Sequence, residues 1–357
     1  MTILKIAVLL RGQLRAAEEG AHLFKKFVID KFPQHEFRFF ISAPLRISNF
    51  ISPVPEYSCK NLLHSEAEEK INFWPLVQQF SFQSESELFN TVKKIVVELL
   101  HDHQLIDWVA SYNKKYNNKK GQFDFTNPPV TDCGSDNIIM KSYIIELHNL
   151  LSQYYSFACA FKVLKDYTST TEYIPDLVWS TRTDVFHIFN AIDHFDILLN
   201  QLNNLYNDKI SNKKAIISNV VLIDNNHPFV CDFNFFSTYK MLDTILNLDN
   251  QTCHDIIYNA MIKNKAHIVK LSTAGNTLQH TMWSAIFNNV CFCQTELKHV
   301  SSIIRHSFSS IDILKMTGTK EDASLIMKMR SDYKHIIQKL VMNDNMICDE
   351  FDYLSKN

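Results

Sequence analysis

Apolar and polar positions in the first part of the chain follow two different periods. Residues 3–10 form a short apolar run, whereas residues 17–32 carry apolar side chains at every third or fourth position. The first pattern is typical of a buried strand and the second of an amphipathic helix. Residues 37–42 return to a strand pattern. A strand, a helix and a second strand in this order predict a parallel sheet with helices on its faces, and therefore an α/β fold.

The alternation continues to the end of the chain after one irregular region. Four prolines interrupt residues 43–84, which we interpret as an elaborated loop region. The strongest helical stripe covers residues 136–167. The remaining patterns predict helices over 86–112, 192–205, 239–248 and 320–342, and strands over 176–185, 215–223, 229–235, 290–293 and 298–305. We therefore expect one domain with a mostly parallel sheet over residues 1–310, followed by a helical C-terminal extension over residues 311–357.

The composition is that of an ordinary globular protein. Hydrophobic residues make up 46% of the chain and charged residues 21%, which excludes a disordered or fibrous chain. Because 36 basic side chains stand against 38 acidic ones, no overall charge favours nucleic acid as a partner. No apolar run approaches the ~20 residues of a membrane span, so we expect no transmembrane segment and a cytoplasmic protein. The eight cysteines lack metal-ligand spacing and are expected to be reduced, with no functional role.

The chain has only six glycines, so we expect each of them to be required by the structure at its position. Gly12 directly follows the first strand, where a residue without a side chain allows a sharp turn and lets backbone N–H groups approach a phosphate. Nucleotides bind open parallel sheets at this place, beyond the carboxyl ends of strands. Arg11 and Arg15 flank the turn, and guanidinium groups can hold a diphosphate. The alternative interpretation is an ordinary strand-to-helix turn with two solvent-exposed arginines.

Two later strands are expected to deliver acidic side chains to the same end of the sheet. Arg182 and Asp184 share one face of the strand that follows the long helix. They can form a structural ion pair, or Asp184 can hold a divalent cation through its carboxylate oxygens. Asp232 and Asn234 share one face of a further strand. If the sheet brings the two aspartates together, their mutual repulsion is typical of an active site.

Short motifs in a fixed order resemble a group of bacterial and viral glycosyltransferase-like proteins of surface polysaccharide synthesis. Residues 10–15, L-R-G-Q-L-R, are similar to the S-G-Q-x-R opening of that group, with Arg11 in place of the small residue. Residues 152–156, S-Q-Y-Y-S, match its S-Q-x-Y-S segment, and residues 176–184, D-L-V-W-S-T-R-T-D, match its D-x-V-x-x-R-x-D strand. Residues 232–241, beginning D-F-N-F-F-S and ending in Met241, resemble its next strand and helix.

The resemblance implies a GT-A-like, Rossmann-like fold and an enzyme that transfers a sugar from a nucleotide-sugar donor to a glycan or protein acceptor. It places six residues at the donor: Arg11, Gly12, Gln13, Arg15, Gln153 and Asn234. Asp184 stands where such enzymes place a metal-binding acid, which would hold Mn²⁺ or Mg²⁺. Arg182 replaces the first acid of that motif, so it can neutralise the diphosphate itself, and the cation is then dispensable. Asp232 is the candidate base that activates the acceptor hydroxyl.

A second hypothesis belongs to a different class of protein. The chain can be a non-catalytic nucleotide- or carbohydrate-binding module that retains the fold of a glycosyltransferase without its chemistry. A phosphotransferase or hydrolase is disfavoured, because the sequence has no P-loop, no G-x-S-x-G motif and no histidine cluster with metal-ligand spacing.

Overall fold

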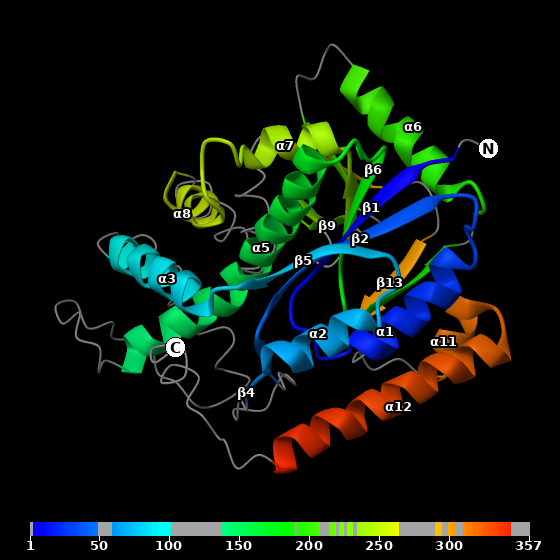
Figure 1. The fold of residues 1–357 in the computed structure, drawn as a ribbon, viewed down its shortest axis with the longest axis horizontal. Coiled ribbons are helices and arrows are strands. Elements are labelled where there is room, and N and C mark those ends of the chain that lie inside the picture. Colours follow the sequence, from blue (N-terminus) through cyan, green and yellow to red (C-terminus); the bar gives the residue numbers. More distant parts are fainter. Residues whose placement is uncertain are drawn as a thin grey trace.

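A seven-stranded sheet forms the centre of the molecule (Figure 1). The computed structural model describes residues 3–48, 59–100, 138–189, 191–207, 214–218, 221–224, 227–230, 234–263, 290–294, 299–303 and 310–343. The strands of the sheet lie in the order β12-β8-β11-β6-β1-β2-β5. Their bounds, in chain order, are β1 Lys5–Arg11, β2 Glu36–Pro44, β5 Val77–Gln83, β6 Leu177–Arg182, β8 Lys214–Ser218, β11 Asn234–Ser237 and β12 Val290–Gln294.

The sheet is mostly parallel. Strand β1 runs parallel to both of its neighbours, β2 and β6, and β5 extends the parallel set at one edge. Strand β11 is antiparallel to β6 and to β8, and β12 pairs parallel with β8. Three two-stranded pairs also occur in the described parts of the chain: β3 Arg46–Ser48 with β4 Cys59–Asn61, β7 Val185–Phe189 with β13 His299–Ile303, and β9 Val221–Asp224 with β10 His227–Val230. The predicted α/β class is confirmed.

Helices cover both faces of the sheet because its central strand is apolar on both. In β1, Ala7 and Leu9 face one core, whereas Ile6, Val8 and Leu10 face another. The first core includes α3 Glu85–Leu100, α5 Ile138–Thr170, α7 Tyr239–Leu246 and α8 Cys253–Lys263. The second includes α1 Ala17–Phe24, α2 His64–Asn72 and α6 His194–Asn207. Figure 1 shows α3, α5 and α8 together on one side of the sheet and α1 and α2 on the other.

The C-terminal helices pack against the start of the chain. Ile313 of α11 Ser310–Thr317 and Ile326 of α12 Lys320–Asn343 share a third apolar cluster with Leu23 of α1 and Phe186 of β7. Lys26 and Asp322 form an ion pair of 2.7 Å beside this cluster. The division into residues 1–310 and 311–357 stays a prediction. None of the helices that the structure describes combines the length and apolar character that a membrane span requires.

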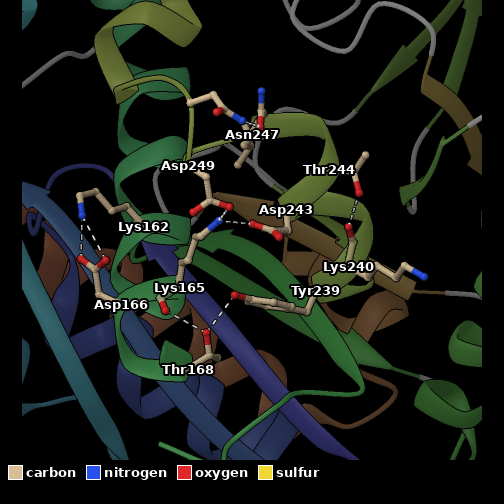
Figure 2. A network of polar contacts seen from close by, with 12 residues as sticks. Lys162, Lys165, Asp166, Thr168, Tyr239, Lys240, Asp243, Thr244, Asn247 and Asp249 are labelled. Atoms are coloured by element: carbon tan, nitrogen blue, oxygen red, sulfur yellow. Dashed lines mark hydrogen bonds and ion pairs between the residues drawn. The ribbon is translucent and has the colours of Figure 1, made fainter. Parts of the chain in front are cut away.

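Helix α5 is fixed to α7 by a polar network (Figure 2). Lys165 of α5 donates hydrogen bonds to Asp243 at 2.6 Å and to Asp249 at 2.7 Å. The hydroxyl groups of Thr168 and Tyr239 lie 2.9 Å apart. These contacts orient the C-terminal half of α5 along the sheet, which leaves its N-terminal half at the opposite end, where the parallel strands finish.

Several local predictions differ from the structure. The predicted strands 215–223 and 229–235 each include parts of two strands, β8 with β9 and β10 with β11, that belong to different sheets. Residues 43–84 are not a loop region, because they contain α2 and the edge strand β5. The predicted strand 176–185 is two strands, since β6 ends at Arg182 and β7 begins at Val185. Helix α8 was not predicted. Residues 101–112 of one predicted helix, and residues 231–233 of one predicted strand, lie outside the described residues.

Candidate functional site

Arginines end the two central strands at the same edge of the sheet. Arg11 is the last residue of β1 and Arg182 the last residue of β6, and the two are partners in the register of these parallel strands. Arg11 is only 1% exposed, and its Nε donates a hydrogen bond of 3.1 Å to Ser180 Oγ. The structure therefore brings Arg11 and Arg182 together at the carboxyl ends of β1 and β6, the edge where nucleotides bind open α/β sheets.

The turn after β1 depends on glycine for its backbone conformation. Gly12 has a φ of +92°, and no atom lies within 4 Å of the place where a side-chain carbon would stand. A left-handed backbone is therefore what selects glycine here, rather than close packing. The following carbonyl, that of Gln13, accepts a hydrogen bond of 2.8 Å from Thr183 Oγ1. This bond ties the turn after β1 to the turn after β6.

A second glycine, which the sequence analysis did not single out, lets α1 approach that turn. A side-chain carbon at Gly20 would lie 1.9 Å from the carbonyl oxygen of Thr183, far inside van der Waals contact, and 3.3 Å from the Trp74 ring. The helix therefore touches the backbone between β6 and β7 directly. Arg15, which lies between Gly12 and α1 in the sequence, contacts Asp184 in the same turn between β6 and β7.

Asp184 lies in the turn between β6 and β7 and is enclosed by two guanidinium groups. Arg182 donates from Nε to Oδ1 at 2.8 Å and from a terminal nitrogen to Oδ2 at 2.7 Å, which is a bidentate pair. Arg15 Nε lies 3.4 Å from Oδ2. The side chain of Asp184 is 3% exposed. The structural ion pair is therefore present, and Arg11 and Arg15 are both buried, which contradicts the interpretation of two solvent-exposed arginines.

This arrangement does not fit a divalent cation at Asp184. Both carboxylate oxygens already accept hydrogen bonds from Arg182, and the positive charges of Arg182 and Arg15 repel a further cation. Within the described ranges, no three histidine, cysteine, aspartate or glutamate side chains gather in a way that could hold a metal ion. Asp232, the predicted base and possible second ligand, lies outside the described residues. The metal-ligand role of Asp184 stays a prediction that this geometry does not favour.

The S-Q-Y-Y-S segment of α5 contacts the carboxyl ends of β2 and β5. Ser42 of β2 is the register partner of Arg11, and its Oγ accepts a hydrogen bond of 3.2 Å from Gln83 Nε2. Ser156 of α5 donates in turn to Gln83 Oε1 at 3.0 Å. Gln153 lies one turn earlier on the same helix and is half-buried. The second sequence motif is thus brought to the same edge as the first.

Asn234 also lies at the carboxyl end of β6, but its side chain contacts the apolar core. It begins β11 opposite Thr181, is fully buried, and its Oδ1 accepts a hydrogen bond of 2.5 Å from Trp179 Nε1. Trp179 belongs to the apolar core beneath α1 and α6. The amide of Asn234 therefore contacts that core beneath the end of β6, and its predicted part in donor binding stays a prediction.

Buried histidines lie near this edge and were missed by the sequence analysis. His187 Nε2 lies 2.8 Å from Thr181 Oγ1, and burial lowers the pKa of His187 to about 3. Farther along the edge, Glu85 Oε2 lies 3.5 Å from His148 Nε2 and 3.7 Å from Arg46. Burial, and then the charge of Arg46, lowers the pKa of His148 well below its usual value. Both imidazoles are thus neutral at pH 7. An isolated histidine in an apolar segment gives no sequence signal for such a position.

Comparisons with known proteins leave the family open. No protein family matches the sequence, and no curated protein matches it either. A solved structure of the galactosyltransferase LgtC, in complex with donor and acceptor sugar analogs, is similar to this chain with a TM-score of 0.32 and 9% sequence identity. The likeness covers 81% of this chain and 73% of that one. At this level of similarity it carries no argument about fold or function.

Proposed function

We propose that the chain is a glycosyltransferase that uses a nucleotide-sugar donor and a glycan or protein acceptor. The observation that carries the proposal is the convergence of Arg11, Arg15 and Arg182 at the carboxyl ends of β1 and β6. Guanidinium groups fixed in advance can stabilise the charge that develops on a leaving diphosphate. The motifs that resemble the glycosyltransferase-like group supply three of the segments at this edge, and Asp232, in the fourth motif, remains the proposed base.

In this proposal the arginines perform the work that a divalent cation performs in related chemistry. Arg182 is held in one orientation by its bidentate pair with Asp184, and Arg15 is held by the same carboxylate. Asp184 is then a positioning residue rather than a metal ligand. Donor turnover is therefore expected to persist in EDTA.

The test measures release of nucleotide from a panel of UDP-, GDP-, CMP- and dTDP-sugars, with Mn²⁺ and with EDTA. Arg182→Ala should lower the rate by ~10²- to 10³-fold, the loss typical of one preorganised electrostatic group. Arg38→Ala is the matched control, because Arg38 pairs with Glu36 at the amino end of β2, far from the proposed site. Rates are compared per folded molecule. Equal rates for the two variants would overturn the proposed role of Arg182.

The alternative of a non-catalytic binding module is favoured by one observation, the enclosure of Asp184 by arginines. An acid held in this way is a structural partner and brings no chemistry of its own. Nucleotide-sugar binding without release of nucleotide, measured by calorimetry and by product analysis on the same sample, would support the module. Turnover of any donor in the panel would exclude it.

A further inference from the structure

A glutamine at the edge of the sheet joins strand β2 to helix α5. Gln83 is the last residue of β5. Its Nε2 donates a hydrogen bond of 3.2 Å to Ser42 Oγ of β2, and its Oε1 accepts one of 3.0 Å from Ser156 Oγ of α5. All three side chains are buried. Because both ends of the amide are used, this position requires a side chain that donates and accepts at the same time.

The contact of Gln83 with Ser42 lies on the face of the sheet that also carries Arg11. Ala7 and Leu9 of β1 face the core that α5 covers, so the strand period of two puts Arg11 on the same face. Ser42 is the register partner of Arg11 in β2, and neighbouring strands lie about 4.8 Å apart. The bond from Gln83 therefore ends one strand away from the buried arginine of the candidate site.

Helix α5 runs in the direction opposite to the parallel strands. The hydroxyl of Tyr167, near the end of the helix, donates to Gln78 at the amino end of β5, whereas Ser156, earlier in the helix, donates to Gln83 at the carboxyl end. Gln153 precedes Ser156 by about one helical turn and lies on the same face of the helix, about 5 Å farther along its axis. Gln153 therefore lies beyond the carboxyl ends of the strands, where open α/β sheets bind nucleotides.

We propose that Gln83 is a positioning residue for the nucleotide-sugar donor. By joining Ser42 to Ser156, it fixes the distance between Arg11 and the turn of α5 that carries Gln153. The inference rests on the proposed function, because the donor is what Arg11 and Gln153 are proposed to contact. Gln83 acts through the two serines that occupy its amide. A displacement of about 1 Å in contacts of this kind can lower a rate on the order of 100-fold.

The first test compares two glutamines of the same strand. Gln83→Met keeps the length of the side chain and removes both hydrogen bonds, so we expect kcat/KM for the donor to fall by about 10- to 100-fold, mostly through a higher KM. Gln78→Met is the matched control, because Gln78 also accepts a hydrogen bond from α5 but is exposed and lies at the amino end of β5. It should leave both constants within about twofold of the unaltered chain. Rates are compared per folded molecule.

Gln83→Glu separates positioning from a merely structural role. A protonated carboxyl donates one hydrogen bond and accepts another, as the amide does, whereas a carboxylate can only accept. Burial raises the pKa of a carboxyl, so we expect this variant to recover a low KM for the donor as the pH falls from about 8 to about 5. Gln83→Met should show no such recovery. A merely structural role would change the free energy of unfolding and leave the KM of the folded molecules unaltered.

Two results would overturn the proposal. One is an equal KM for the donor in Gln83→Met and Gln78→Met, and the other is a Gln83→Glu variant whose KM stays as high as that of Gln83→Met at every pH. Ser156→Ala removes the hydroxyl group that Gln83 holds on α5 and should also raise KM. It decides the question if the Gln83 variants fail to fold, which circular dichroism reports, and an unchanged KM in this variant would then overturn the proposal.

Binding of UDP, GDP, CMP and dTDP, measured by calorimetry, separates this proposal from the proposed function. If the unaltered chain binds one of these nucleotides but releases none from any sugar donor, the transfer reaction is contradicted. The positioning role is then tested by the dissociation constants of the same variants, with the same expected order. If the unaltered chain binds none of the nucleotides, both proposals are overturned.

Discussion

The two ends of the sheet each contain an ion pair, but the two pairs differ in how far they are buried. At the carboxyl ends of β1 and β6, the side chain of Asp184 is 3% exposed and lies between two arginines. Toward the amino ends, Lys165 and Asp243 form a pair of 2.6 Å, but their side chains are 18% and 35% exposed (Figure 2). The ion-pair distances at the two ends are similar, but the exposure of the side chains differs. Burial, rather than contact geometry, separates the two regions.

This difference changes what each pair contributes. An exposed pair contributes about 0–1 kcal/mol to folding, because water screens it and two long side chains must be ordered. A buried pair gains little net stability from its attraction, since both ions lose their hydration, yet removing one partner leaves an uncompensated charge. The pair at the amino end is therefore replaceable, whereas the cluster at the carboxyl end must remain complete. A preorganised anion site has the same requirement.

The largest expected effect comes from the glycine that admits α1 to this region. Gly20→Ala places a carbon atom on the carbonyl oxygen of Thr183, which belongs to the backbone and cannot move away alone. We expect a loss of about 3 kcal/mol or more in the free energy of unfolding, measured with urea. Gly12→Ala is the matched control: its side chain meets open space, so only the left-handed backbone costs about 1–2 kcal/mol. Equal losses would show that α1 does not need this close approach.

The next effect tests the comparison of charges directly. Asp184→Asn removes the charge that faces Arg182 and Arg15 without changing side-chain volume, and we expect a loss of about 3 kcal/mol in unfolding free energy. Asp243→Asn removes one partner of the partly exposed pair, and we expect a loss below about 1 kcal/mol. Both are measured by urea unfolding at one ionic strength. A loss below about 1 kcal/mol at Asp184 would mean that the buried pair behaves like a surface pair.

Much of this arrangement could be predicted from the sequence because the signals were local. The apolar run of β1, the stripe of α5 and the glycine after β1 each reflect one element and its neighbours. Arg11, Arg15 and Arg182 were placed at one edge because the carboxyl ends of parallel strands coincide. The enclosure of Asp184 was left open, since its alternatives differ only in three-dimensional contact.

The features that were missed share a physical reason. Strand β5, V-Q-Q-F-S-F-Q, lies at the edge of the sheet and is only partly buried, so its polar residues hide the strand pattern. Gly20 is required by the backbone of Thr183, more than a hundred residues away. Such contacts between distant segments leave no periodic trace in the sequence.

The smallest effect concerns acid, and it arises from the buried histidine beside the carboxyl end of β6. Burial lowers the pKa of His187 to about 3, so above pH 6.5 the imidazole is neutral in both the folded and the unfolded chain. As the pH falls below about 6.5, the unfolded chain binds a proton at this histidine that the folded chain does not bind. The free energy of unfolding therefore declines until about pH 3. Between pH 7 and pH 5 this amounts to about 2 kcal/mol for one histidine. His194, also with a pKa lowered to about 3, acts in the same direction, whereas Glu19, whose pKa burial raises, acts against them at lower pH.

His187→Gln keeps a polar group near Thr181 but does not titrate. Between pH 7 and pH 5, the free energy of unfolding of this variant should therefore fall about 2 kcal/mol less than that of the unaltered chain. If the two proteins instead lose unfolding free energy in parallel as the pH falls, His187 binds its proton in the folded state.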